Sequence, residues 1–300
     1  MDEFAGKKLY VITGCTATGK TKYAIEFASK INAEIVSCDS LLVYKGMDIG
    51  TAKPTGGELE KVRHHALNLV TPDHNFDVAK YIEYAREAVN DILMRGKNVV
   101  IVGGSGLYLR GFYYPVVDDV PIDEEINTLV DDMYERYGLD HVVNELLKIN
   151  DGDCQNMDIK NPRRVLIALK RCLSSGKSIA ELLDNFKNRG TCFDMFDKFT
   201  ILLDLDKEEI FSRVVKRTED MSKNGLVDEV SVLLKKYKNL CNSAKNAIGY
   251  RETISWLSHP TSEDDLKHKI ISDTMKLVKK QRTWFRTQIP INAKYMSKNN

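Results

Sequence analysis

Residues 14–21, GCTATGKT, have the residue types and spacing of a phosphate-binding loop, G-x-x-x-x-G-K-[ST]. Gly14 and Gly19 allow a tight turn, so that successive amide N–H groups point into a concavity that suits an anion. Lys20 supplies a positive charge for phosphate oxygens, and Thr21 supplies a hydroxyl for a magnesium ion. The loop therefore predicts that a diphosphate or triphosphate binds here, without identifying which one.

Two further polar side chains follow apolar segments that are typical of strands. Asp39 comes soon after residues 33–37, and Ser105 stands in the glycine-rich run 103–106 after residues 98–102. Ligands of open α/β sheets bind along the edge where the strands end, so both side chains are candidates for chemistry. The sequence leaves alternatives open, because Asp39 also suits a turn and Ser105 also suits a helix N-cap.

The elements around the loop come in the order that this motif requires. Residues 9–12 form an apolar run before it, and after it apolar residues recur at helical spacing: Tyr23, Ala24, Phe27, Ala28 and Ile31. Residues 98–102, which are apolar after Asn98, fit a central parallel strand, and residues 200–205 are also strand-like. We predict an α/β fold with a parallel sheet of the P-loop NTPase class, formed by residues 1–117 and 199–300.

The sequence pattern changes in the middle of the chain. Between residues 118 and 198 strand-like runs are absent, and four helical segments are predicted, at 122–137, 139–149, 161–173 and 178–187. This pattern predicts a helical domain inserted into the α/β core. Arg163 and Arg164 begin the third of these helices, where they suit contact with nucleic acid or simply a solvated face.

The C-terminal part carries several basic helices. Arg213 and Arg217 are four residues apart and fall on one side of a helix predicted at 208–217. The last helix is predicted to start near Ser262 and bears a cluster of basic residues around a tryptophan: Lys276, Lys279, Lys280, Arg282, Arg286 and Trp284. Basic residues interleaved with an aromatic ring favour a surface that follows phosphates, although a solvated helix is the simpler alternative. Asp204 offers a rival metal-binding carboxylate at the end of a strand.

Composition narrows the class of protein. The net charge of +1 means that any nucleic-acid site must come from local patches. The six cysteines show no C-x-x-C pair, which indicates reduced thiols in a cytoplasmic protein. No signal-peptide core or membrane-spanning run is present, and we expect a monomer. The adjacent His64 and His65 do not predict a metal site, because neighbouring residues of a regular element point to different faces.

These motifs together resemble the tRNA dimethylallyltransferase family, also called tRNA isopentenyltransferases, of the bacterial type. The resemblance runs from residue 9 to residue 286 and includes, in order, GCTATGKT, SCDS, VYKGMDIGTAKP, VGGSGLY, NPRRVLIALK, RTEDMSKNGLVDEV, IGYRE and KKQRTWFR. It implies transfer of a dimethylallyl group from dimethylallyl diphosphate to the exocyclic amine of adenosine 37, directly 3′ of the tRNA anticodon. It departs from the family loop at two positions, where Cys15 stands for proline and Thr18 for serine.

The resemblance also implies roles for individual residues. Asp39 corresponds to the general base, and Ser105 to a hydroxyl near the bridging oxygen of the diphosphate. Arg217 corresponds best to the arginine that contacts the diphosphate, with Arg213 close enough to be confused with it. The phosphate loop supplies the rest of the diphosphate site, with Mg²⁺ held through Thr21: Gly14, Cys15, Thr16, Ala17, Thr18, Gly19, Lys20 and Thr21.

For tRNA, the resemblance implies that the adenosine is extruded into a channel and that the helical insertion grips the anticodon stem. The corresponding RNA-contacting residues are Asp39, Ser40, Leu41, Leu42, Ser105, Arg163, Arg164, Tyr250 and Arg251, together with Arg282 and Arg286 of the basic helix. Asn127 is a weak substitute for an arginine that the family often carries in the first insertion helix.

Three other functions fit parts of the sequence. A small-molecule P-loop kinase would use the loop and Asp39 but leaves the insertion and the basic helix unexplained. An isopentenyltransferase acting on free AMP, ADP or ATP would share the same chemistry on a smaller acceptor. A non-catalytic RNA-binding protein would have no need to combine Lys20, Asp39 and Ser105. Whether ATP or another nucleotide occupies the loop is left open by the sequence.

Overall fold

The computed structural model describes residue 4 and residues 6–117, 120–155 and 157–296. The chain forms two compact units, one from residues 1–116 and 191–300 and the other from residues 117–190. The C-terminal boundary of the second unit comes before residue 198, because Phe193 and Phe196 are buried in the core of the first unit.

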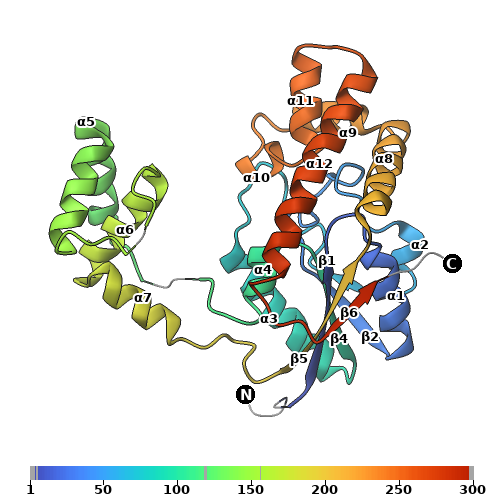
Figure 1. Ribbon diagram of the computed structural model, residues 1–300, viewed down its shortest axis with the longest axis horizontal. Helices are drawn as coiled ribbons and strands as arrows, with labels where there is room; N and C mark the ends of the chain where they lie inside the picture. The colour runs from blue at the N-terminus through green and yellow to red at the C-terminus, as the bar shows by residue number, and fades with distance from the viewer. Residues whose placement is uncertain (1–3, 5, 118–119, 156, 297–300) are drawn as a thin grey trace. The chain divides into compact units, whose positions relative to one another are not determined.

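The first unit is built on a parallel sheet (Figure 1). Six strands are seen within the described residues, in the order β3-β2-β4-β1-β5-β6. Their bounds are Lys8–Gly14 for β1, Ala33–Ser37 for β2, His64–His65 for β3, Asn98–Gly103 for β4, Asp197–Asp204 for β5 and Ala293–Met296 for β6. Every neighbouring pair is parallel, so the carboxyl ends of all the strands meet at one edge.

The four strands predicted from apolar runs are therefore confirmed, and the two short outer strands were missed. β3 contains only two residues and β6 only four, too few for a periodic pattern to distinguish them from loops. Both lie at edges of the sheet, where one side of a strand needs no hydrogen-bonding partner.

Helices cover both faces of the sheet, as the wholly apolar strands require. On one face, α1 (Lys20–Lys30) buries Ala24, Ile25 and Ala28 against strand residues such as Ile12 and Val100. On the other face, α3 (Val78–Met94), α4 (Gly106–Arg110) and the end of α12 (Glu263–Phe285) pack on strand residues that include Val11 and Ile101. Figure 1 shows α1 and α3 on opposite sides of the strands.

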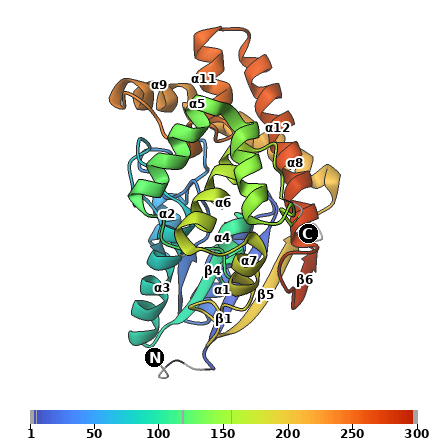
Figure 2. The same cartoon turned by 90° about the vertical axis from the view of Figure 1, so that its left-hand side faces the viewer.

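A second hydrophobic cluster lies beyond the carboxyl edge of the sheet. It joins the segment 43–47 to a group of helices: α8 (Lys207–Lys223), α9 (Leu226–Lys236), α10 (Asn242–Lys245), α11 (Tyr250–Ser258) and the first half of α12. Ser262 caps α12, at the predicted start of this helix, and forms a capping box with Asp265. α11 and α12 run side by side (Figure 2). α2 (Gly56–Leu59) is a single turn in the long connection after β2. The cluster anchors the loops that surround the cavity described below.

The second unit contains three helices within its described residues: α5 (Glu124–Ile149), α6 (Pro162–Ser175) and α7 (Ile179–Lys187), seen in Figure 2. α5 corresponds to the two helices predicted at 122–137 and 139–149, and it is interrupted at Gly138, whose φ is 77°. α6 starts as the sequence predicts, with Asn161 as the cap and Pro162 in the first turn. The unit has its own core, built around Val130, Leu146, Val165 and Leu169.

Candidate active site

A cavity of about 1110 Å³ opens at the carboxyl edge of the sheet in the first unit. The phosphate loop after β1, the segment after β2 and the glycine-rich loop after β4 form one side of it. α8, α11 and α12 contribute the other walls, with Arg217, Arg251 and Gln281 among the lining residues. Because β2, β4 and β1 are adjacent in the sheet, residues far apart in sequence meet here.

The phosphate loop has the close packing that its glycines allow. A Cβ on Gly14 would lie 2.2 Å from the main-chain oxygen of Leu203 in β5, so only glycine fits at that position. Gly19 has a φ of 83° and immediately precedes α1. Ala17 also has a positive φ, 65°, which side-chain-bearing residues adopt rarely. The amides of the loop therefore lead into the N-terminus of α1, where the helix dipole favours an anion.

The two departures from the usual loop sequence point away from the cavity. Cys15 is buried, and its Sγ lies 3.7 Å from the main-chain oxygen of Val278 in α12. Thr18 is also buried, and its hydroxyl donates a hydrogen bond of 2.8 Å to the oxygen of Cys15. Both substitutions thus leave the backbone amides of the loop free to define its inner surface.

Lys20 is the positive charge closest to the loop backbone. Its Nζ donates a hydrogen bond of 2.6 Å to the main-chain oxygen of Cys15. Burial lowers the pKa of Lys20 to about 8, while the carboxylate of Asp39 acts in the opposite direction. An ammonium group in such surroundings is stabilised strongly by an incoming anion.

The two arginines of α8 differ in their partners. Arg217 donates to the hydroxyl of Thr16 and to the main-chain oxygen of Thr51, each at 3.1 Å, and burial lowers its pKa. Arg213 instead forms an ion pair with Glu209, at 2.6 Å. The uncharged acceptors orient Arg217 without cancelling its charge, whereas the charge of Arg213 is already compensated.

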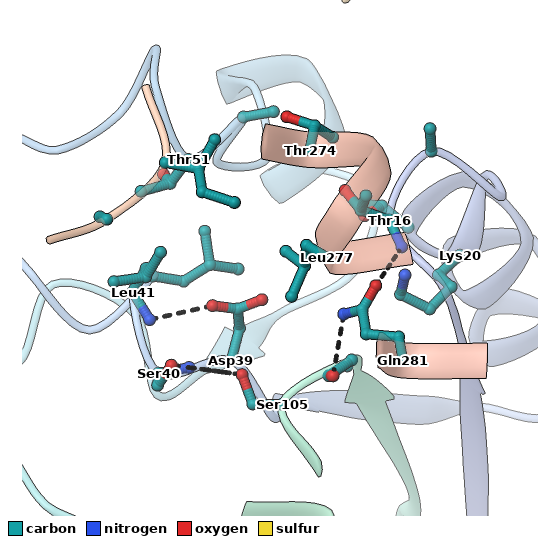
Figure 3. A pocket seen from close by; sticks show the side chains of 18 of the residues that line it. Thr16, Lys20, Asp39, Ser40, Leu41, Thr51, Ser105, Thr274, Leu277 and Gln281 are labelled. Atoms are coloured by element: carbon teal, nitrogen blue, oxygen red, sulfur yellow. Dashed lines mark hydrogen bonds between the residues drawn. The ribbon is translucent and has the colours of Figure 1, made fainter. Parts of the chain in front are cut away.

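Asp39 and Ser105 extend into the same cavity from neighbouring strands (Figure 3). The Oδ1 of Asp39 accepts a hydrogen bond of 2.9 Å from the amide of Leu41, which fixes the carboxylate. The Oγ of Ser105 accepts one of 3.0 Å from the amide of Ser40. Ser105 does precede α4, but its hydroxyl makes no capping hydrogen bond, so the alternative role as a side-chain cap is excluded.

Gln281 of α12 is a cavity residue to which the sequence assigned no role. Its Oε1 accepts a hydrogen bond of 2.9 Å from the amide of Thr16, and its Nε2 donates one of 3.1 Å to the oxygen of Gly104 (Figure 3). One turn further on, Trp284 lies so close that a Cβ on Gly106 would be 2.7 Å from its ring. The only available signal was the glutamine between basic residues in the sequence KKQRTWFR.

Several residues predicted to contact RNA line the cavity, whereas Tyr250 does not. Ser40, Leu41, Leu42 and Arg251 all contribute to its walls. Tyr250 is fully buried, and its hydroxyl donates a hydrogen bond of 2.6 Å to Glu229. This burial contradicts the prediction of an RNA contact at Tyr250, which occupies the hydrophobic cluster of α8–α12 instead.

The basic residues of the C-terminal helix α12 differ in their surroundings, because some have partners within the fold and others are exposed. Arg282 pairs with Asp204 at 2.9 Å and also donates to the oxygen of Leu205, so its guanidinium already has partners within the fold. The same ion pair, together with Lys294 at 3.5 Å, occupies the carboxylate that offered a rival metal ligand. Arg286 is exposed at the end of α12.

In the second unit, Arg163 and Arg164 are exposed in the first turn of α6. Lys170, from the same helix, is buried and donates to Asp131 at 2.7 Å and to Asn127 at 2.6 Å. The amide oxygen of Asn127 thus stabilises a buried lysine, a structural role that the sequence did not indicate. The two arginines are the exposed positive charges of this helix start.

Possible metal ligands in the cavity are few. Thr21 and Asp39 both line it and offer a hydroxyl and a carboxylate, a donor set that suits Mg²⁺ completed by water and substrate phosphates. In the described part of the chain, no group of three or more His, Cys, Asp or Glu side chains is placed to hold a metal. His65 is buried and forms a hydrogen bond of 2.7 Å with Glu34, and so has a structural role.

No helix among the residues that the structure describes has both the length and the apolar character needed to cross a membrane.

The fold and the cavity define an α/β protein in which an anion-binding loop faces a carboxylate at the carboxyl edge of a parallel sheet. A sequence profile described as IPP transferase matches residues 42–288. The chain belongs to this IPP transferase family, and the resemblance predicted from its motifs is confirmed.

Curated relatives and solved structures agree with this assignment. A tRNA dimethylallyltransferase of Opitutus terrae is 44% identical over 283 residues, covering 94% of this chain and 91% of the relative. A tRNA dimethylallyltransferase 2 of Geotalea daltonii is 34% identical, with 95% and 86% covered. The structure of a tRNA isopentenylpyrophosphate transferase from Bacillus halodurans has a TM-score of 0.68 at 28% identity, with 97% and 90% covered. That of a eukaryotic dimethylallyltransferase acting on tRNA has a TM-score of 0.79 at 25% identity, with 95% of this chain and 73% of the other covered.

Proposed function

We propose that the protein transfers a dimethylallyl group from dimethylallyl diphosphate to the exocyclic amine of adenosine 37 in tRNA. The observation that carries this proposal is the shared cavity of the phosphate loop, Arg217 and Asp39. The walls of this cavity include both a loop suited to a diphosphate and a carboxylate suited to accepting a proton, and this combination supports the proposal. The names of the relatives specify tRNA and the dimethylallyl group. The position of the adenosine comes from the resemblance of the sequence motifs to those of the tRNA dimethylallyltransferase family.

In this proposal the sheet and loop are a P-loop NTPase-like core adapted to a leaving group. The bond between C1 of the allyl group and the bridging oxygen breaks, and the diphosphate carries away the electron pair. Lys20, Arg217 and the loop amides stabilise the negative charge that builds up on it. Ser105 lines the same cavity and supplies a hydroxyl for the bridging oxygen as it separates.

A bound Mg²⁺ fits the same arrangement, with the hydroxyl of Thr21 as the protein group that would hold it and with water and diphosphate oxygens completing its coordination. Such an ion would supply further charge stabilisation for the diphosphate oxygens. Lys20 and Arg217 provide positive charge from the protein itself, so the diphosphate would be stabilised by these two side chains as well as by the metal ion.

Asp39 has the role of orienting the amine and taking its proton. The exocyclic nitrogen of adenine forms a bond to C1 and must lose one proton to remain neutral. The Oδ1 of Asp39 is held by the amide of Leu41, so the carboxylate is fixed beside the space where the amine would enter (Figure 3). A positioned base of this kind typically accelerates such a transfer about 10²- to 10⁴-fold.

For the tRNA itself, the second unit supplies the additional surface. Arg163 and Arg164 add two positive charges to the N-terminus of α6, where the helix dipole already favours an anion. A cation placed there is unfavourable for the isolated helix, so the position makes sense for a surface that meets phosphate. We propose that this unit grips the anticodon stem and that the protein acts as a monomer.

The test is a transfer assay with labelled dimethylallyl diphosphate and Mg²⁺. Three acceptors are compared: an anticodon stem-loop with adenosine at position 37, the same stem-loop with guanosine there, and free AMP. Label in the adenosine stem-loop alone is the expected result. Label in AMP would favour an adenylate isopentenyltransferase, and ATP hydrolysis stimulated by small acceptors without any prenyl transfer would favour a kinase.

A further inference from the structure

The carboxylate of Glu229 in α9 is surrounded by donors from a single loop. Its Oε2 accepts hydrogen bonds from the amides of Asp48 and Ile49, at 2.9 and 2.8 Å. Its Oε1 accepts one from the amide of Gly50, at 3.2 Å, and one from the hydroxyl of Tyr250, at 2.6 Å. Three consecutive amides that converge on one carboxylate form an anion-binding nest, filled here by a side chain of the same protein.

The loop can approach Glu229 in this way only because residue 50 is a glycine. A Cβ on Gly50 would lie 2.4 Å from the ring of Tyr250, which is itself fully buried. The ring thus supports the loop from behind while its hydroxyl completes the set of donors to the carboxylate. Four hydrogen bonds to one ionised group make this a strong local constraint.

The next residue of the loop connects this nest to the cavity. The hydroxyl of Thr51 donates to the oxygen of Met47, at 2.7 Å, which closes the loop on itself. The main-chain oxygen of Thr51 then accepts the hydrogen bond of 3.1 Å from Arg217. The second nitrogen of that guanidinium reaches the hydroxyl of Thr16 in the phosphate loop.

We infer that Glu229 is a positioning residue that fixes Arg217 for the diphosphate of the donor. The inference rests on the proposed function and assigns a role to a side chain outside the cavity wall. An arginine side chain loses rotamer entropy on being fixed, and a prearranged acceptor reduces what is lost when the donor binds. The carbonyl of Thr51 provides that acceptor without neutralising the guanidinium, and Glu229 holds the carbonyl in place through the loop.

Glu229→Gln is the first variant to test. A carboxamide has one acceptor atom, and its NH2 group would face amide donors, so at least one of the loop's hydrogen bonds is lost. We expect the KM for dimethylallyl diphosphate to rise about tenfold or more, with the dissociation constant for tRNA changed less than twofold. Asp228→Asn removes the neighbouring exposed carboxylate of α9 and serves as the matched control, with both constants close to those of the wild type.

A double-mutant cycle separates positioning from a general loss of structure. If Glu229 acts through Arg217, then Glu229→Gln added to Arg217→Ala changes the KM for the donor less than twofold further. Independent, multiplicative effects would overturn the inference. If thermal melting shows that Glu229→Gln does not fold, Tyr250→Phe is tested in its place, because it removes only one of the four hydrogen bonds. We expect this variant to raise the KM for dimethylallyl diphosphate about two- to threefold. An unchanged KM would count against the inference.

Chemical rescue by an added anion provides a further measurement of the role of Glu229. In Glu229→Ala, acetate can enter the vacated nest and is expected to lower the KM for the donor, whereas chloride at the same ionic strength does not. Equal effects of the two anions would contradict the inference. The wild type is assayed alongside, so a lack of prenyl transfer by the wild type refutes the proposed function, and normal transfer by all variants refutes only the role of Glu229.

Discussion

The Nζ of Lys20 is folded back onto its own loop, where it donates a hydrogen bond of 2.6 Å to the main-chain oxygen of Cys15. Burial lowers the pKa of this ammonium to about 8, even though Asp39 lies near enough to oppose the shift. The free site therefore holds a lysine that is protonated at neutral pH but loses its charge in mildly alkaline solution.

Donor binding should consequently weaken above pH 8. The diphosphate raises the pKa of Lys20 in the complex, because opposite charges favour the protonated form. Binding then takes up a proton at higher pH, and the dissociation constant of dimethylallyl diphosphate should rise by up to about tenfold per pH unit. Calorimetric titration between pH 7 and pH 9.5, in buffers with different ionisation enthalpies, measures both the affinity and the proton uptake.

Lys20→Arg is the control for this prediction, since a guanidinium stays charged throughout the range. Its affinity for the donor should be weaker at pH 7 but nearly constant up to pH 9.5. A slope equal to that of the wild type would show that another group titrates, and the role assigned to Lys20 would have to be abandoned.

Replacement of Asp39 should separate turnover from tRNA binding. Asp39→Asn keeps the shape and an oxygen able to accept from the amide of Leu41, but it cannot take a proton. We expect kcat to fall about 10²- to 10⁴-fold, with the dissociation constant for the stem-loop changed only a few-fold. Single-turnover transfer and filter binding measure the two quantities, and near-normal turnover would disprove the assignment of Asp39 as the base.

The two arginines of the second unit should act through charge alone. Arg163→Ala combined with Arg164→Ala should raise the KM for tRNA and reduce the slope of log K against log salt by about 1 to 2, as expected when two phosphate contacts are lost. Lys148→Ala, which removes an exposed charge paired with Glu145 in the same unit, is the matched control. If the control and the double variant have the same salt dependence, the arginines do not contact phosphate.

The sequence predicted four of the strands because their central residues are largely apolar, as in residues 99–102, a pattern that two covered faces impose. The alternative roles left open for Ser105 could not be resolved in the same way. Whether its hydroxyl caps a helix depends on an angle within the loop, and in the structure it instead accepts from the amide of Ser40. A motif fixes the residue type at such a position but not the direction of the side chain.

Partners distant in sequence explain why the sequence did not reveal the contacts that three of the named residues make within the fold. Arg282 sits in a basic stretch that suggests phosphate binding, yet it pairs with Asp204, seventy-eight residues away. Asn127 and Lys170 likewise form a pair across two helices. Tyr250 looks like a surface aromatic in IGYRE but is fully buried. Spacing along the chain shows which residues share an element, whereas these contacts depend on how the elements pack.

Gln281 connects the phosphate loop to the loop that carries Ser105 by hydrogen bonds, so its replacement should affect donor binding. Gln281→Glu retains an acceptor for the amide of Thr16 but replaces the donor to Gly104 with a second carboxylate oxygen. It also adds a negative charge to the wall of the cavity beside the diphosphate site. We expect the KM for dimethylallyl diphosphate to rise about tenfold or more, since like charges repel strongly where water is partly excluded.

Thr283→Glu is the matched control, since it adds the same charge two residues further along α12 on the exposed surface. Its KM for the donor should stay within twofold of the wild type, and raising the salt concentration should remove even that difference because exposed charges are screened. The effect of Gln281→Glu should persist at high salt. Equal donor KM values for the two variants would mean that the diphosphate binds away from Gln281 and that the phosphate loop is used differently from the way proposed here.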